Sequence, residues 1–223
     1  MTDTHTLAPP DFAAARRHMI ESQLRPSDVS DPVVIAAMAV ARREDFVPAA
    51  QKPLAYIDRA VTLAEGRVLN PALSTGLMLT RAELSGNDKV LLIGAGTGYF
   101  AALLAGIVAH VVAVEDNHAL VEHARAALAS TANVSIIESP LQEGHAANAP
   151  YDLIIIDGAV QQVPDAIIAQ LAEDGRLLAG VDENGVSRLA IGRRRAGAFA
   201  LVPFADTDIA PLAAFARPKS YSF

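Results

Sequence analysis

The feature that most constrains this chain is a regular alternation of short apolar runs and helical patterns that begins at Lys89. The apolar runs consist almost entirely of Val, Ile, Leu and Ala, and they span 90–93, 111–114, 134–137 and 153–156. The segments between them carry apolar residues at helical spacing, over 101–108, 119–128 and 163–171. A continuously apolar strand must be covered on both faces. The alternation therefore predicts a parallel sheet with helices on both sides.

Further strands are expected after this alternating region. They follow from the patterns at 175–179, 187–191 and 199–203. The segment 193–197 joins the last two and leaves no room for a helix, so these two strands are predicted to be antiparallel. The chain is therefore predicted to have an α/β fold with a doubly wound, mostly parallel sheet.

The first third of the chain has the spacing of helices. Apolar residues recur at helical intervals over 12–24 and again over 73–84. Between these segments, Asp31 can accept hydrogen bonds from the first free amides of a helix that begins at Pro32. Residues 1–10 contain two prolines and no periodic apolar pattern. We therefore expect a disordered tail at 1–10, a helical cap at 11–86 and the sheet domain at 87–223.

Charge and cysteine content exclude several classes of function. The formal net charge is −7, with 18 basic and 25 acidic side chains, which argues against nucleic acid as a partner because such binding needs a basic surface. The sequence has no cysteine, which excludes disulfides and thiolate chemistry and fits the cytoplasm. The longest nearly apolar run, 99–114, is shorter than the roughly 18–20 residues of a membrane span, so no membrane partner is expected.

A glycine-rich turn follows the first predicted strand of the sheet. It consists of Gly94, Ala95, Gly96, Thr97 and Gly98. Glycine is needed where the backbone turns sharply and a ligand lies directly against it. A dinucleotide-binding turn would have its third glycine at position 99, which is Tyr99 here, and this disfavours NAD. S-adenosylmethionine needs only a mononucleotide-sized site, with its carboxylate near the start of the following helix. Residues 87–223 are therefore predicted to form a Rossmann-like domain that binds S-adenosylmethionine.

Three acidic positions follow later strands of the predicted sheet. Glu115 ends the second strand, about 20 residues after the first glycine, where a carboxylate can accept hydrogen bonds from both ribose hydroxyls; the alternative is a solvated acid. Glu138 and Ser139 follow the third strand and either lie beside the adenine or are merely exposed. Asp157 follows the fourth strand and either contacts the cofactor's ammonium or the substrate, or caps a turn at Gly158.

A metal site is not expected from this sequence. His118, Glu122 and His123 superficially suggest a zinc-binding helix. Their H-x-x-x-E-H spacing is one residue longer than the inverted zinc motif, so we interpret them as ordinary helix residues.

Several segments together resemble the protein-L-isoaspartate O-methyltransferase family. The shared strings span 19–25, 31–33, 37–38, 43–48 and 55–58, and the resemblance continues through the core from Lys89 to about Leu178. The strings R-E-D-F-V-P and A-Y-x-D are far more specific than the glycines. The resemblance implies a class I S-adenosylmethionine-dependent methyltransferase with an N-terminal helical cap and a substrate loop. It also implies an activity in protein repair, in which a carboxylate of isoaspartyl residues in damaged proteins, or of a related acceptor, is methylated.

The resemblance fails in the substrate loop. The family has G-Q-T-I-S-Q-P there, and its serine and threonine help to hold the isoaspartyl carboxylate. The matching stretch here runs from Glu65 through Arg67, Leu69 and Asn70 to Pro71, with Leu69 in place of the serine and Arg67 in place of the threonine. Arg67 either holds the acceptor carboxylate by a bidentate pair or faces water.

Three functional hypotheses follow from these residues. The first is a methyltransferase in which Gly94, Gly96, Gly98 and Glu115 hold the cofactor and the acceptor is a peptide or protein carboxylate. The second, motivated by Leu69, is a protein of the same fold that binds S-adenosylmethionine or a partner but has lost the chemistry. The third, an oxidoreductase that uses NAD, is disfavoured by Tyr99.

Overall fold

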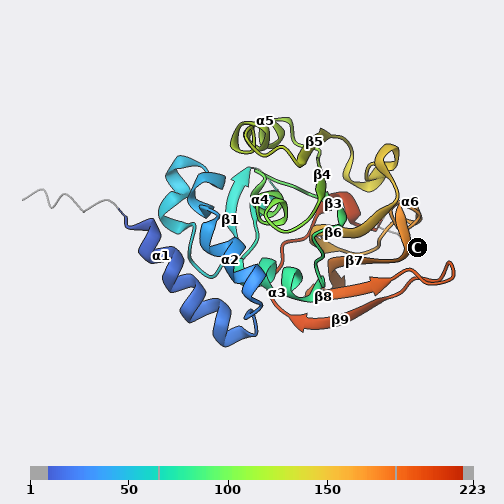
Figure 1. Ribbon diagram of the computed structural model, residues 1–223, viewed down its shortest axis with the longest axis horizontal. Coiled ribbons are helices and arrows are strands. Elements are labelled where there is room, and N and C mark those ends of the chain that lie inside the picture. Colours follow the sequence, from blue (N-terminus) through green and yellow to red (C-terminus); the bar gives the residue numbers. More distant parts are fainter. Residues whose placement is uncertain (1–9, 65, 184, 218–223) are drawn as a thin grey trace, which may run out of the picture.

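The fold is built on one seven-stranded sheet, seen in a computed structural model that describes residues 10–64, 66–183 and 185–217 (Figure 1). Its strand order is β5-β4-β3-β6-β7-β8-β9. The strands are β3 (Lys89–Ile93), β4 (His110–Glu115), β5 (Val134–Glu138), β6 (Tyr151–Val160), β7 (Leu171–Glu183), β8 (Val186–Arg193) and β9 (Leu201–Asp206). The five neighbouring strands β5, β4, β3, β6 and β7 pair in parallel, whereas β8 and β9 are antiparallel to their neighbours. The predicted doubly wound, mostly parallel sheet is confirmed.

Alternate residues of the central strands enter two separate apolar layers, which explains why these strands have no polar face. Val90 and Leu92 of β3 pack on the side of the helices α3 (Ala72–Arg81) and α4 (Tyr99–Ala105). Leu91 and Ile93 pack on the opposite side. That side is covered by α6 (Asp165–Ile168) and the short 3-10 turns Leu141–Glu143 and Ala213–Phe215.

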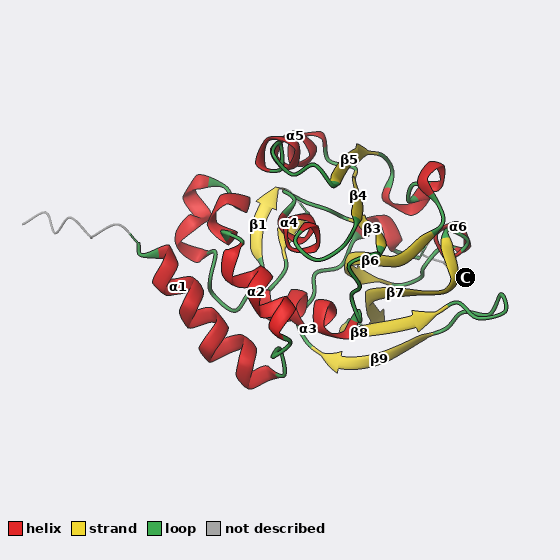
Figure 2. Ribbon diagram, viewed as in Figure 1, coloured by secondary structure: helices red, strands yellow, loops and turns green. Residues whose placement is uncertain are grey.

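The N-terminal segment is mainly helical and packs into the same layer as α3 and α4 (Figure 2). It contains the α-helices α1 (Phe12–Met19) and α2 (Pro32–Val40), the π-helical turn Ile20–Leu24, and the 3-10 turns Arg25–Ser27, Arg43–Phe46 and Ala49–Leu54. The side chain of Asp31 accepts hydrogen bonds from the amides of Val33 and Val34 at the start of α2, as the sequence predicts. Residues 1–9 of the expected tail lie outside the described residues.

Two segments differ from the sequence-based predictions. The helix predicted over 163–171 is limited to Asp165–Ile168, because Leu171 already pairs with Tyr151 as the first residue of β7. Where the resemblance implies a substrate loop before α3, the chain contains a small antiparallel hairpin of β1 (Val61–Ala64) and β2 (Arg67–Leu69). This hairpin forms a sheet of its own and does not join the main sheet.

The helix α5 (His118–Ala127) follows β4 and begins at Asn117, whose side chain accepts hydrogen bonds from two amides of the first turn. Within the described ranges, every helix is too short or too polar to cross a membrane.

Candidate functional site

The site is positioned by the point at which the winding of the sheet reverses. From β3 the chain winds outward through β4 to β5, and it then returns to the other side of β3 with β6. The carboxyl ends of β3 and β6 therefore flank the crevice in which ligands of doubly wound sheets bind. The turn after β3 and Asp157 within β6 both lie at this edge.

The turn after β3 requires glycine at three positions. Gly94, Gly96 and Gly98 have φ values of 80°, 54° and 96°, in the left-handed region that side chains with a Cβ avoid. Gly98 also caps α4, and a Cβ there would lie 2.9 Å from Leu128 Cδ1. The tight turn predicted from the glycine spacing is confirmed.

The other two residues of the turn are buried. Ala95 is part of the apolar core, and the Thr97 hydroxyl donates a 2.5 Å hydrogen bond to the carbonyl of Phe46. Thr97 therefore joins the glycine turn to the N-terminal segment. Its role beside a cofactor stays a prediction.

Glu115 ends β4 and is fully buried. One carboxylate oxygen accepts the amide of Gly96 at 2.7 Å, and the other accepts the amides of Asn117 at 3.0 Å and Asp116 at 3.1 Å. Burial raises the pKa of Glu115, whereas the positive charge of Arg67 and the hydrogen bonds from the Asn117 and Gly96 amides lower it. Glu115 is thus hydrogen-bonded to the glycine turn, and the alternative of a solvated acid is wrong. Its contact with a ribose stays a prediction.

Arg67 forms an ion pair with Glu115. Its two terminal nitrogens donate to the two carboxylate oxygens at 2.6 and 2.5 Å, and Nη1 also donates to Asp116 at 2.8 Å. The Arg67 side chain is 12% exposed, so the alternative that it faces water is wrong. Such a bidentate, charge-assisted pair fixes the orientation of the guanidinium. Its proposed contact with an acceptor carboxylate stays a prediction.

Side chains of the chain itself cover the glycine turn. A Cβ on Gly94 would lie 3.3 Å from Leu212 and 3.5 Å from Arg67, and a Cβ on Gly96 would lie 3.2 Å from Leu63. Leu63 and Arg67 belong to the two strands of the hairpin. The hairpin and Leu212 therefore occupy the space directly above the turn.

Asn70 connects the substrate loop to β6. Its Nδ2 donates to the Asp157 carboxylate at 2.8 Å, and its Oδ1 accepts the amide of Ala210 at 2.9 Å. Burial raises the pKa of Asp157 to about 6, although the hydrogen bond from Asn70 opposes the shift. β6 continues through Gly158 to Val160, so the alternative that Asp157 caps a turn at Gly158 is wrong.

The remaining loop residues are structural in this conformation. Leu69 is 5% exposed and packs in the core, and Pro71 precedes α3 at its N-cap position. Leu69 therefore presents no hydroxyl and no exposed side chain to an acceptor.

Arg43 is not among the site residues that the sequence predicts, yet it holds the substrate loop. It is fully buried, and it donates to the carbonyls of Ala55 at 2.7 Å and Asn70 at 2.5 Å. Its guanidinium carbon lies 4.8 Å from the centre of the Tyr99 ring. The neighbouring Glu44 accepts a hydrogen bond from the Tyr56 hydroxyl. The strings R-E-D-F-V-P and A-Y-x-D thus contain residues of this buried network.

Glu138, the last residue of β5, and Ser139, which follows it, lie at the exposed rim of the site. The Glu138 carboxylate accepts a 2.9 Å hydrogen bond from His118 Nδ1 and raises the pKa of His118. Ser139 is half-buried, and its amide donates to the carbonyl of Glu115 at 3.1 Å. These contacts place both residues next to the Glu115 end of the sheet, and their contact with adenine stays a prediction.

The three residues that superficially suggest a metal site have separate partners. His118 pairs with Glu138, Glu122 pairs with Arg125 at 2.8 Å, and His123 contacts the carbonyl of Asp45 at 3.1 Å. In the part of the chain that the structure describes, there is no group of three or more potential metal ligands.

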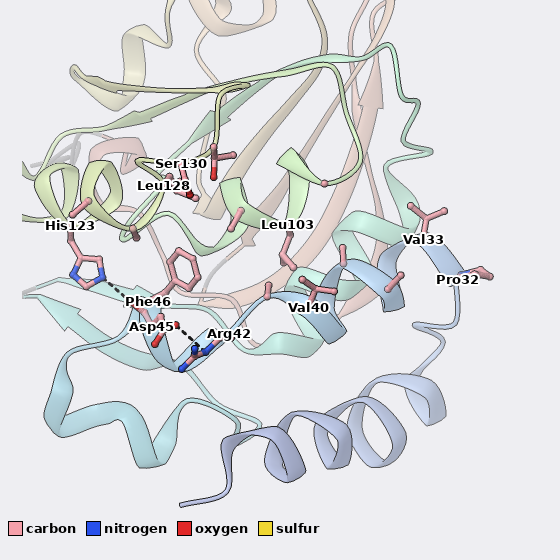
Figure 3. Close-up of a pocket in the computed structure, with 18 residues that line it drawn as sticks. Pro32, Val33, Val40, Arg42, Asp45, Phe46, Leu103, His123, Leu128 and Ser130 are labelled. Atoms are coloured by element: carbon pink, nitrogen blue, oxygen red, sulfur yellow. Dashed lines mark hydrogen bonds and ion pairs between the residues drawn. The ribbon is translucent and has the colours of Figure 1, made fainter.

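A large cavity lies elsewhere, between α2, α4 and α5 (Figure 3). It has a volume of about 1120 Å³, and its lining includes Val33, Val40, Phe46, Leu103 and His123. The glycine turn and Glu115 are not part of this lining, so the cavity is distinct from the crevice at the ends of β3 and β6.

Comparisons with known proteins agree with this geometry. The family model of protein-L-isoaspartate(D-aspartate) O-methyltransferase matches residues 14–213. A protein-L-isoaspartate O-methyltransferase of Koribacter versatilis is 37% identical over 203 residues, covering 90% of this chain and 91% of that protein. One of Methanoculleus marisnigri is 33% identical over 199 residues, covering 88% and 90%.

Solved structures show the same fold. A structure named protein-L-isoaspartate O-methyltransferase matches 89% of this chain and 66% of its own, with a TM-score of 0.77 and 21% identity. A Plasmodium falciparum structure, titled as a complex of such an enzyme with S-adenosyl-L-homocysteine, matches 92% of this chain and 100% of its own, with a TM-score of 0.77 and 17% identity.

Proposed function

This chain belongs to the protein-L-isoaspartate O-methyltransferase family, and from that premise we propose that it methylates a carboxylate of isoaspartyl residues in damaged proteins with S-adenosylmethionine. The acceptor is then a peptide or protein that carries this carboxylate. The observation that carries the proposal is the combination of the three-glycine turn and the buried Glu115 at the switch point of the sheet.

The residues at this edge fit the proposed cofactor. Gly94 and Gly96 let a ligand approach the backbone without a Cβ in between, and Glu115 can accept hydrogen bonds from two ribose hydroxyls. The start of α4 follows the turn and favours the cofactor's carboxylate. We assign Glu138 and Ser139 to the adenine end and Asp157 to the ammonium end. When bound, the cofactor supplies an electrophilic methyl group on a sulfonium.

Methylation of a carboxylate needs no general base. A carboxyl group with a reference pKa of ~4 is already ionised at neutral pH, so its oxygen would bond to the methyl carbon as the bond from that carbon to sulfur breaks and S-adenosylhomocysteine leaves. The task of the protein is to align that oxygen with the methyl group and to exclude water. Arg67 can hold the acceptor carboxylate by two hydrogen bonds in place of the family's threonine. Asn70 and Arg43 fix the loop on which Arg67 lies.

A methyl-transfer assay tests this proposal. The native protein is incubated with radiolabelled S-adenosylmethionine and either an isoaspartyl peptide or the same peptide with ordinary aspartate. We expect label only in the isoaspartyl peptide, with strong loss in Glu115→Ala and no change in the surface variant Glu122→Ala. Equal labelling of both peptides would contradict the specificity, and absence of label would contradict the activity.

The Arg67 assignment has its own test in the same assay. If Arg67 holds the acceptor, Arg67→Ala raises the KM for the isoaspartyl peptide. Strong activity with an unchanged KM in Arg67→Ala would remove this residue from acceptor binding.

A further inference from the structure

We propose that Arg67 competes with the cofactor's ribose for Glu115, so that the β1–β2 hairpin closes the cofactor site in the free protein and must move before the cofactor binds. This inference rests on the proposed function, because it concerns the same site. It adds a residue that determines cofactor affinity and a segment that controls access.

Hydrogen bonds within the chain already occupy the carboxylate of Glu115. A carboxylate offers about four lone-pair sites. Glu115 accepts from the amides of Gly96, Asp116 and Asn117 and from both terminal nitrogens of Arg67. Its acceptor capacity is therefore filled. Two ribose hydroxyls can be accepted only when the guanidinium leaves.

Side chains of the hairpin fill the space above the glycine turn. Leu63 lies within 3.2 Å of the position of a Cβ on Gly96, and Arg67 lies within 3.5 Å of that position on Gly94. These glycines are the backbone positions against which the cofactor is expected to lie. One strand of the hairpin covers each of them, so the hairpin as a whole obstructs the site.

The construction of the hairpin allows it to move. Its strands span only Val61–Ala64 and Arg67–Leu69, they pair only with each other, and their register shifts between Thr62 and Ala64. Val61 and Leu69 at its base are buried in the core, so the end that can move is the one near the turn, which carries Leu63 and Arg67. Its displacement therefore leaves every hydrogen bond of the main sheet intact.

Asp116 lowers the cost of this displacement. Nη1 of Arg67 already donates to the Asp116 carboxylate at 2.8 Å, and the Asp116 side chain is 41% exposed. Arg67 can therefore keep a charged partner near the surface after it leaves Glu115. Once Arg67 no longer pairs with Glu115, its guanidinium can bind an acceptor carboxylate.

Titration calorimetry with S-adenosylhomocysteine tests the competition. The variant Arg67→Thr restores the family's residue and removes the competitor. We expect it to bind S-adenosylhomocysteine at least about tenfold more tightly than the native protein, which corresponds to a site that is open in about one tenth of native molecules. Arg67→Gln, which keeps a long side chain but lacks the charge, serves as a second variant. Arg125→Ala removes a surface arginine that pairs with Glu122 and should leave the affinity unchanged.

Association kinetics separate competition from a general structural effect. If Arg67 must leave first, its removal increases the association rate and leaves the dissociation rate nearly unchanged. Stopped-flow measurements on the native protein and both variants give these rates. Equal or weaker binding by both Arg67 variants, with binding by the native protein intact, would overturn the competition and leave the proposed function standing. No binding by any of the proteins would overturn both.

Discussion

Replacing Arg43 with methionine tests whether the buried network around the substrate loop stabilises the fold. The substitution keeps an unbranched, apolar side chain but leaves the carbonyls of Ala55 and Asn70 without their donor in a buried environment. Each unsatisfied carbonyl costs about 1–3 kcal/mol, and the loss of the contact with the Tyr99 ring adds up to about 2 kcal/mol. The substitution also removes the desolvation penalty of a buried guanidinium, which offsets part of this loss of stability. That penalty is the reason why burial lowers the pKa of Arg43.

We therefore expect Arg43→Met to lower the free energy of unfolding by about 3 kcal/mol, which lowers the Tm of a chain of this size by about 6–12 °C. Urea denaturation, followed by circular dichroism, measures the free energy. The matched control is Arg42→Met, because the Arg42 side chain is 63% exposed and pairs from the surface with the buried Glu44 at 3.4 Å and with the exposed Asp45 at 3.2 Å. We expect it to change the free energy of unfolding by less than about 1 kcal/mol. Equal effects of the two substitutions would refute the role of the buried network.

Three further predictions concern single contacts. Burial raises the pKa of Asp157 to about 6 from a reference near 3.8, so protonation of this carboxyl group favours the folded state. The resulting stabilisation of about 3 kcal/mol is present below pH 4 and is lost as the pH rises to about 6. In urea melts at a series of pH values, Asp157→Asn should remove this pH dependence. Thr97→Val removes the donor to the carbonyl of Phe46 and should cost about 1–3 kcal/mol in the same assay, whereas Thr62→Val on the exposed side of β1 should cost less than about 0.5 kcal/mol; equal costs would contradict the contact. Asp31→Ala removes the N-cap of α2 and should lower stability by about 1 kcal/mol, while Asp31→Asn, which keeps an acceptor oxygen, should be nearly neutral.

The parallel sheet could be predicted from the sequence because its strands are apolar on both faces. Val90 to Ile93 alternate between two covered layers, so every side chain is apolar and the sequence contains an uninterrupted apolar run. The glycine turn could be predicted for a similar reason, since a positive φ at Gly94, Gly96 and Gly98 favours glycine at those positions. Both features depend on residues that are adjacent in the sequence.

The hairpin and its ion pair could not be predicted in this way. β2 has three residues, which is too short for an alternation to be recognised, and its partner β1 is equally isolated. Arg67 and Glu115 are 48 positions apart, and nothing local to either residue indicates the other. The short α6 has the same cause, because the pairing of Leu171 with Tyr151 across the sheet overrides the helical spacing of 163–171.

The substitution of arginine for the family's threonine therefore affects two ligands at once. Arg67 can pair with the acceptor carboxylate or with Glu115, but its fork fits only one carboxylate bidentately at a time. An acceptor that draws Arg67 away from Glu115 opens the cofactor site, and a cofactor that occupies Glu115 releases Arg67 for the acceptor. Because such coupling is reciprocal, each ligand must increase the affinity for the other by the same factor. A titration of S-adenosylhomocysteine with and without an isoaspartyl peptide measures that factor, and it should fall to one in Arg67→Thr. A factor that persists in Arg67→Thr would show that the coupling does not pass through this residue.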